Sequence, residues 1–452
     1  MNDWNGKHVH FVGIGGISMS GLAMMLLDKG CRVSGSDWHL SPLTDKLAAL
    51  GADIFQGHAA QQVHGADLVV YTAAAPQDNP ELVEARRLNI PLWERARLLD
   101  HVMKQYPHSI GVAGTHGKSS TSSMIASIFV EAQLDPAVHL GAELPLIGGS
   151  ARPGSGDVFI TEACEYKDSF LLFPPTVAVI LNIDNDHLDY FKDIDHIQAS
   201  FAKYVSMLPQ DGFAIGFGDD PRAREVVENA RCAHTTYGYE PHNDWRISNA
   251  DHDEKGCAHF DLTGPKGQFV RVAVGVAGMH NALNAAAALV TADRFGVDLQ
   301  QAAASIAGYH GAGRRFQKAA TVNGADVIHD YAHHPTEIKA SLEAGRLITK
   351  GKLRCVFQPH TYTRTRLLFD PLVEALATAD EVIMPDIYAA REAADGVTSS
   401  LKVVEALQAK GIPAVYQPDF AAISALLHEE LQPGDVALIL GAGDIEKLTH
   451  ML

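Results

Sequence analysis

Short apolar, β-branched runs alternate with amphipathic stretches along almost the whole chain. This alternation predicts α/β layers built on mainly parallel sheets. Three runs, at residues 8–12, 109–113 and 327–330, each predict a strand that opens a new α/β unit. We therefore expect three domains of the α/β class.

The elements that follow these strands are also indicated by the pattern. A helix is expected at about residues 18–29 after the first strand, and another running to residue 132 after the second. After the third strand we expect a helix at 335–348 and strands at 353–357, 381–384 and 436–440. The strand-rich segment 233–274 predicts a lobe of the central domain.

Two turn-rich stretches divide the chain between these units. They are Tyr106-Pro107-His108 and Gly311-Ala312-Gly313. We expect domains at residues 1–107, 108–313 and 314–452. The length of 452 residues agrees with three domains of about 150 residues each.

Composition narrows the function classes. The chain is 46% hydrophobic and 20% charged, with a net charge of −18, which argues against a nucleic-acid surface. Its five cysteines are scattered and form no Cys-x-x-Cys pair, so neither a disulfide framework nor a thiolate metal site is expected. The first residues, MNDWNGKHVHFVGIGG, lack a signal pattern, and no apolar run is long enough to cross a bilayer. We expect a cytoplasmic protein without a membrane span, either a monomer or a homodimer.

The strongest chemical signal is a glycine-rich turn between the second opening strand and its helix. It reads Gly114-Thr115-His116-Gly117-Lys118-Ser119-Ser120. Backbone amides in such a turn bind phosphate oxygens, and here Lys118 would reach the β- and γ-phosphates while Ser119 binds Mg2+. The strict phosphate-loop spacing is not met, because Val112 occupies the first glycine position and Gly111 comes one place too early. A structural turn with a solvated lysine is the alternative.

Candidate metal ligands follow two strands downstream. Residues 158–161 lead into Glu162, and residues 177–181 lead into a polar run that ends at His187. Strand ends beside a phosphate loop are where α/β folds place ligand groups. Because Mg2+ prefers oxygen, Glu162 is the better candidate of the two.

A second glycine turn lies near the N-terminus. It contains Gly13, Ile14, Gly15, Gly16 and Ser18, and Asp37 follows about twenty residues on. This partly matches a dinucleotide fingerprint, but Ser18 holds the third glycine position. The turn predicts binding of a pyrophosphate without distinguishing NAD from another nucleoside diphosphate.

Several motifs together resemble the Mur ligases of peptidoglycan synthesis, and the resemblance runs from about Val9 to Gly443. Besides the phosphate loop, they are Gly13-Ile14-Gly15-Gly16 with Met19-Ser20-Gly21, Asn182-Ile183-Asp184-Asn185-Asp186-His187, His280-Asn281-Ala282-Leu283-Asn284, Gly313-Arg314-Arg315-Phe316, Asp330-Tyr331-Ala332-His333-His334-Pro335-Thr336-Glu337, and Phe357-Gln358-Pro359-His360-Thr361-Tyr362-Thr363-Arg364-Thr365-Arg366.

The resemblance implies a fold and a reaction. The fold has a Rossmann-like N-terminal domain for the UDP-linked substrate, a central P-loop ATPase-type domain with a parallel or mixed sheet, and a Rossmann-like C-terminal domain that contacts the amino acid and the nucleotide. The reaction uses ATP and Mg2+ to join L-alanine to the lactyl carboxylate of UDP-N-acetylmuramate through an acyl phosphate. A sister ligase that attaches a recycled peptide is the closest alternative. An NAD-linked dehydrogenase and a non-catalytic nucleotide-binding scaffold are the alternatives of other classes.

The resemblance also assigns residues to roles. Catalysis falls to Lys118, Glu162, His187 and Arg315, and the metal ligands are Ser119, Glu162 and His187. ATP is contacted by the phosphate loop from Gly114 to Ser120 and by Asn281, Asn284, Arg315 and Asp330. The UDP substrate is contacted by Gly13, Ile14, Gly15, Gly16, Ser18, Asp37 and Thr72. The amino acid is contacted by His334, His360, Arg364 and Arg366. The stretch from Arg391 to Asp395 departs from the family's usual forms.

Overall fold

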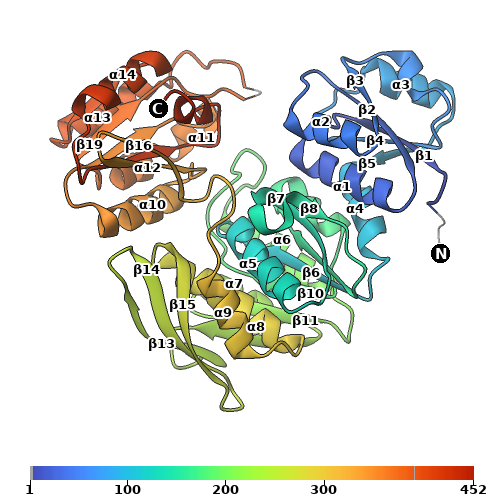
Figure 1. Cartoon of the computed structure of the whole chain (residues 1–452), viewed down its shortest axis with the longest axis horizontal. Helices are drawn as coiled ribbons and strands as arrows, with labels where there is room; N and C mark the ends of the chain where they lie inside the picture. Colours follow the sequence, from blue (N-terminus) through green and yellow to red (C-terminus); the bar gives the residue numbers. More distant parts are fainter. Residues whose placement is uncertain (1–3, 391) are drawn as a thin grey trace.

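Each third of the chain is built around a sheet of its own in the computed structural model, which describes residues 4–390 and 392–452. In Figure 1 the N-terminal part (blue) and the C-terminal part (orange to red) lie on opposite sides of the view, above the central part. Among the described residues, none of the helices combines the length and apolar character that crossing a bilayer requires.

The first sheet has five strands, all parallel, in the order β3-β2-β1-β4-β5. Its strands are β1 (His8–Val12), β2 (Arg32–Asp37), β3 (Asp53–Gln56), β4 (Leu68–Tyr71) and β5 (Leu92–Glu94). The helices are α1 (Ile17–Asp28), α2 (Pro42–Ala49), α3 (Pro80–Arg87) and α4 (Arg95–Met103), with the short 3-10 helix η1 (Ala60–Val63). Strand β1 is buried along its whole length, as expected of a central parallel strand.

The central sheet has ten strands in the order β15-β14-β13-β12-β11-β10-β6-β9-β7-β8. They are β6 (His108–Ala113), β7 (Ala137–Leu144), β8 (Gly149–Arg152), β9 (Val158–Glu162), β10 (Val177–Ile180), β11 (Phe213–Phe217), β12 (Ala233–Gly238), β13 (Trp245–His252), β14 (Cys257–Thr263) and β15 (Phe269–Ala277). The helices are α5 (Lys118–Glu131), α6 (Ile194–Ser206), α7 (Pro221–Glu228), α8 (His280–Arg294) and α9 (Leu299–Ala307), with η2 (Pro145–Ile147) and η3 (Tyr166–Leu172).

The position of β6 in this sheet places the site. Strand β6 pairs in parallel with β9 on one side, where Val112 lies opposite Glu162, and with β10 on the other, where Ala113 lies opposite Ile180. The carboxyl ends of all three strands therefore meet at one edge, so the loop after β6 lies between Glu162 and the run that follows β10.

The segment 233–274, which the sequence predicts to be a strand-rich lobe of the central domain, lies in the central part of the chain. Its strands extend the central sheet: β12 is parallel to β11 and β13 is parallel to β12, whereas β14 is antiparallel to β13 and β15 is antiparallel to β14. Exposed and buried residues alternate along β15, and its contacts with α8 and α9 show where the buried face packs. This apolar face requires the helices of the central part, which is why the strands join that sheet.

The third sheet has the order β16-β17-β21-β18-β19-β20, parallel except for the edge strand β16. Its strands are β16 (Gln317–Val322), β17 (Ala325–Asp330), β18 (Leu353–Phe357), β19 (Glu381–Met384), β20 (Ala414–Tyr416) and β21 (Val436–Leu440). The helices are α10 (Pro335–Ile348), α11 (Tyr362–Leu367), α12 (Phe369–Leu376), α13 (Ser400–Ala409), α14 (Phe420–Glu430) and α15 (Glu446–Thr449). Helix α10 and strands β18, β19 and β21 have the expected bounds.

Candidate functional site

The phosphate loop turns sharply between β6 and α5 and needs glycine at two positions. Gly114 has φ +147° and Gly117 has φ +83°, the half of backbone space that side chains disfavour. A Cβ on Gly117 would lie 2.6 Å from Asn284 Oδ1, and one on Gly114 would lie 2.8 Å from the Cβ of Leu181. The loop is therefore pressed against both α8 and the end of β10.

The run after β10 braces this loop through hydrogen bonds. The backbone amide of His116 donates to Asn182 Oδ1 (2.8 Å), and Asn182 Nδ2 donates to the carbonyl of His116 (3.0 Å). The backbone amide of Asp184 donates to the Thr115 hydroxyl at 2.9 Å. These contacts hold the loop's backbone while the first amides of α5, which have no partner within a helix, stay available for a ligand.

Lys118 folds back on its own loop. Its Nζ donates to the carbonyls of Gly114 (2.5 Å) and Thr115 (3.1 Å) and lies 3.0 Å from Glu165 Oε2. Burial opposes the charge, but the neighbouring carboxylate of Glu165 holds the pKa of Lys118 above its usual value. Glu165 was not predicted from the sequence. Its position three residues beyond the end of β9 was the available signal.

Three predicted residues meet at the first turn of α5. The Ser119 hydroxyl donates to Glu162 Oε2 (3.0 Å), and the Arg315 guanidinium donates to the same hydroxyl (3.2 Å). The other oxygen of Glu162 accepts the amide of Gly141 at 2.6 Å. A hydroxyl and a carboxylate are oxygen donors of the kind Mg2+ prefers. His187 lies instead 3.9 Å from Glu165 and 3.8 Å from Asp186, so its part in a metal site stays a prediction.

A cavity of about 390 Å³ opens beside these residues, and we call it the loop cavity. The central part supplies Ser119, Asn281 and Asn284, while the third part supplies Asp330 and other residues. Burial raises the pKa of Asp330, whose carboxylate accepts a hydrogen bond from Ser341 at 2.6 Å. Further lining residues that the sequence did not indicate are Phe217, Asp220, Tyr237, His280 and Tyr309.

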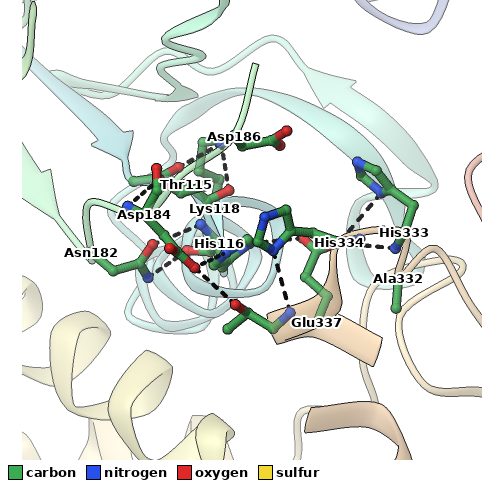
Figure 2. Close-up of polar contacts among 12 residues, drawn as sticks. Thr115, His116, Lys118, Asn182, Asp184, Asp186, Ala332, His333, His334 and Glu337 are labelled. Carbon is green, nitrogen blue, oxygen red and sulfur yellow. Dashed lines mark hydrogen bonds and ion pairs between the residues drawn. The ribbon is translucent and has the colours of Figure 1, made fainter. Parts of the chain in front are cut away.

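His116 lies between two carboxylates at the wall of the loop cavity (Figure 2). Its Nε2 is 3.1 Å from Asp184 Oδ2 and its Nδ1 is 3.2 Å from Glu337 Oε1. The ring of His334 lies 4.7 Å away, and one nitrogen or oxygen each from His116, Asp184 and His334 fall within 4.8 Å of one another. Burial acts against the charge, but Asp184 and Glu337 raise the pKa of His116 to about 9. A metal ion at these three residues would have to displace the proton from His116.

A second cavity of about 410 Å³, which we call the arginine cavity, is lined by Asp186, His187, His360 and Arg364 among others. Arg364 Nη2 lies 3.1 Å from Asp186 Oδ1, and Arg364 Nη1 lies 3.1 Å from His360 Nδ1. Burial lowers the pKa of His360 to about 4, so its ring is neutral and the arginine carries the charge.

Two other residues predicted to contact the amino acid do not line the arginine cavity in the part of the chain that the structure describes. Arg366 is exposed and pairs with Asp395 at 3.1 Å. The ring of His334 points to the carbonyl of Asn185 at 2.8 Å and to the phosphate loop. Within the divergent stretch that ends at Asp395, Arg391 lies outside the described residues.

The first glycine turn leads from β1 into α1, with Gly16 as the residue before the helix and Thr72 packed under Gly13. The amide of Gly15 donates to Asp37 Oδ2 at 2.9 Å, so this carboxylate holds the turn itself. Ile14 is fully buried. The Ser18 hydroxyl lies 3.1 Å from His139 of β7 and accepts from Arg95 at 3.0 Å.

Arg95 was not anticipated. It is partly buried, desolvation lowers its pKa, and it brings a guanidinium to the start of α1 beside the glycine turn. A partly buried arginine at a helix start is suited to binding an anion.

The comparisons with known proteins agree with this layout. Three family models match consecutive parts of the chain: "Mur ligase family, catalytic domain" at residues 8–107, "Mur ligase middle domain" at 112–292 and "Mur ligase, glutamate ligase domain" at 314–443. A UDP-N-acetylmuramate–L-alanine ligase of Clostridium tetani is 46% identical over 98% of this chain and 96% of its own length. A solved UDP-N-acetylmuramate–alanine ligase of Thermotoga maritima superimposes with a TM-score of 0.83 at 26% identity, covering 98% of this chain and 97% of that one. A murein peptide ligase of Psychrobacter arcticus shares the fold, with a TM-score of 0.75 at 23% identity and 98% and 97% coverage.

Proposed function

This chain belongs to the Mur ligase family, and we propose that it uses ATP to join L-alanine to the lactyl carboxylate of UDP-N-acetylmuramate. The observation that carries the proposal is the pair of cavities on either side of the run after β10. The loop cavity contains the features of a nucleotide site, and the arginine cavity has a partly buried guanidinium, that of Arg364, which now pairs with Asp186 and could bind a carboxylate.

The first step forms an acyl phosphate. A lactyl carboxylate oxygen attacks the γ-phosphorus of ATP, the bond to the β–γ bridging oxygen breaks, and ADP leaves. Lys118 gives up its hydrogen bonds to the loop carbonyls and donates to phosphate oxygens instead. Arg315, which already donates to the Ser119 hydroxyl, stabilises the negative charge on the phosphoryl group during its transfer. Ser119 and Glu162 would hold Mg2+, which neutralises phosphate charge when bound.

The second step forms the amide. Arg364 binds the carboxylate of L-alanine, and the amine nitrogen attacks the acyl carbon. The tetrahedral intermediate collapses and expels inorganic phosphate. The ammonium group must first lose a proton. There are three candidate bases: His187, His334 and Asp330. Among the described residues, His187 is the one of these that lines the arginine cavity. We therefore propose that His187 accepts the proton from the ammonium group.

The UDP end of the substrate belongs to the first part of the chain. The glycine turn before α1 and the nearby Arg95 suit a diphosphate. Helix α1 packs on β7 and β8 of the central part, and the Ser18–His139 contact joins the two parts. A substrate anchored at α1 can therefore extend its lactyl group toward the edge of the central sheet.

Phosphate release tests the proposal. The purified protein is supplied with ATP, Mg2+, UDP-N-acetylmuramate and each of the twenty amino acids in turn, with a recycled tripeptide as a further acceptor. We expect release with L-alanine well above all other acceptors and none without the UDP-sugar. Faster release with the tripeptide would favour the sister ligase, and no release with any acceptor would refute the ligase assignment.

A further inference from the structure

Several contacts between the third part of the chain and the central part lie at the phosphate loop and the run after β10. From α10, the Thr336 hydroxyl donates to Asp184 Oδ2 at 2.8 Å and His334 Nε2 lies 2.8 Å from the carbonyl of Asn185. Glu337 Oε1 lies 3.2 Å from Nδ1 of His116, which belongs to the phosphate loop itself. The start of the helix at Pro335 thus contacts the phosphate loop through Glu337 and the run after β10 through Thr336. Figure 2 shows His116 with Asp184, His334 and Glu337 around it.

Among the described residues of this contact, His116 is the histidine that lies between two carboxylates. Each of its ring nitrogens faces a carboxylate, one from Asp184 and one from Glu337. A neutral imidazole has a single N–H, so only the protonated ring donates to both. Hydrogen bonding to His116 holds the pKa of Asp184 below its usual range. Burial opposes the charge on Glu337, but His333 and then His116 and Arg315 hold the pKa of Glu337 well below its usual value.

The other charged groups nearby do not replace this proton. Arg315 and His333 also act on Glu337. Arg315, however, is hydrogen-bonded to Ser119, and burial lowers the pKa of His333, so that ring is neutral. Burial and the charge of His116 lower the pKa of His334, so that ring is neutral. Without the proton on His116, two carboxylates from different parts of the chain would face one neutral ring.

We propose that His116 is a positioning residue whose imidazolium ties the phosphate loop to Glu337 of α10, so that one proton favours the closed arrangement in which the loop cavity is complete. The loop cavity takes lining residues from both parts, including Asn281 on one side and Ser341 on the other. A nucleotide that needs both sides binds only the closed form. Its measured affinity therefore scales with the closed fraction.

The direction of the pH dependence follows from linkage. Closure adds Glu337 to the Asp184 carboxylate already beside His116 and so raises the pKa of His116 further. The closed form therefore gains stability that is fully present below the pKa of His116 in the open form. This gain is lost as pH rises toward about 9, where the closed form also gives up the proton. Asp184 stays beside His116 in the open form because both belong to the central part, so only the contribution of Glu337 is lost on opening.

The test measures ADP binding by calorimetry, which needs neither the muramyl substrate nor alanine. The variants are His116→Asn, Glu337→Gln and the double variant. Asn does not titrate, and Gln keeps an oxygen for the backbone amides of His333 and His334 that Glu337 now accepts. Glu343→Gln, an exposed position on the same helix paired only across one turn with Lys339, is the matched control.

At pH 7 we expect each single variant to weaken ADP binding about tenfold, the double variant to be no weaker than either single one, and Glu343→Gln to bind like the parent. The ratio of the ADP affinity of the parent protein to that of His116→Asn should fall toward one between pH 6.5 and 9. Titration of the ADP phosphates affects both proteins equally and therefore cancels in this ratio. Small-angle scattering should show the His116→Asn protein less compact with ADP at pH 7. Additive effects of the two single variants, or a ratio that does not change with pH, would overturn the proposal. The proposed ligation could survive that result, because it is tested separately by phosphate release.

Discussion

Replacing Lys118 should cost stability as well as activity, because of its partner. Glu165 is almost fully buried, with 2% of its side chain exposed, and Lys118 is its close ion pair at 3.0 Å. Among the described residues, Lys118→Met leaves that buried carboxylate with His187 as its remaining charge partner, at 3.9 Å from Nε2. Removing one partner of a buried pair typically costs about 3–5 kcal/mol. With partial compensation by His187 we expect about 3 kcal/mol, or a fall of about 6–12 °C in the melting temperature of a unit of this size.

The double variant Lys118→Met/Glu165→Gln separates this cost from the chemistry. It leaves no uncompensated charge, so calorimetry should show most of the melting temperature restored, while phosphate release stays absent in both variants. Lys410→Met is the matched control, because it breaks the exposed Lys410–Glu374 pair and should change stability by less than about 1 kcal/mol. If Lys118→Met melts with the parent protein, or the double variant melts as low as the single one, then Glu165 does not bear a buried charge and the reasoning fails.

Three further predictions concern other parts of the site. Gly117→Ala should abolish ADP binding in calorimetry, because its Cβ would lie 2.6 Å from Asn284 Oδ1 at a φ of +83°; unchanged affinity would contradict the tight loop. Arg364→Ala should raise the KM for L-alanine by about 10- to 100-fold, the value of a charge-assisted hydrogen bond, with a smaller effect on the KM for ATP; equal effects would point to general damage. Burial lowers the pKa of His139 to about 4, so stability should fall by up to about 3 kcal/mol as pH drops from 6.5 to 4; melting curves of His139→Gln should show less of this acid loss, and an identical loss would contradict it.

The elements that sequence predicted well are those with strong local signals. Helix α10 begins with Pro335 at a position where its missing amide costs nothing, and an apolar face continues from there to Ile348. Strands β18, β19 and β21 are short apolar runs bounded by polar residues. Each of these signals is contained within a few residues, so no knowledge of the rest of the chain was required.

The strands of segment 233–274 show what local signals leave out. Their alternation predicts strands, but the sheet they join depends on which apolar surface lies nearby. That surface is formed by α8 and α9, which come later in the chain. Sheet membership is a property of the assembled fold, and a periodic pattern cannot specify it.

The residues of the site likewise fall into those that the sequence indicated and those that only the fold brings together. The residue types of the phosphate loop, Glu162 and Arg315 were visible as motifs, since phosphate and metal binding restrict which side chains can serve. The neighbouring residues that determine the charge states of these side chains could not be identified from the sequence. The strand order β10-β6-β9 determines which loop ends meet, and it brings Glu165 to Lys118 and the run after β10 to the phosphate loop.

His116 makes the point most sharply, because nothing in its own neighbourhood distinguishes it from a spacer between two glycines. The second of its carboxylate partners, Glu337, is 221 positions away and belongs to another sheet. Its protonation is consequently a property of how two parts of the chain are placed, and a change in that placement must change the proton occupancy. The converse holds by linkage: whatever sets the proton on His116 also biases the placement. The protonation of a residue in the phosphate loop is therefore coupled directly to domain closure, and no further structural element is needed for this coupling.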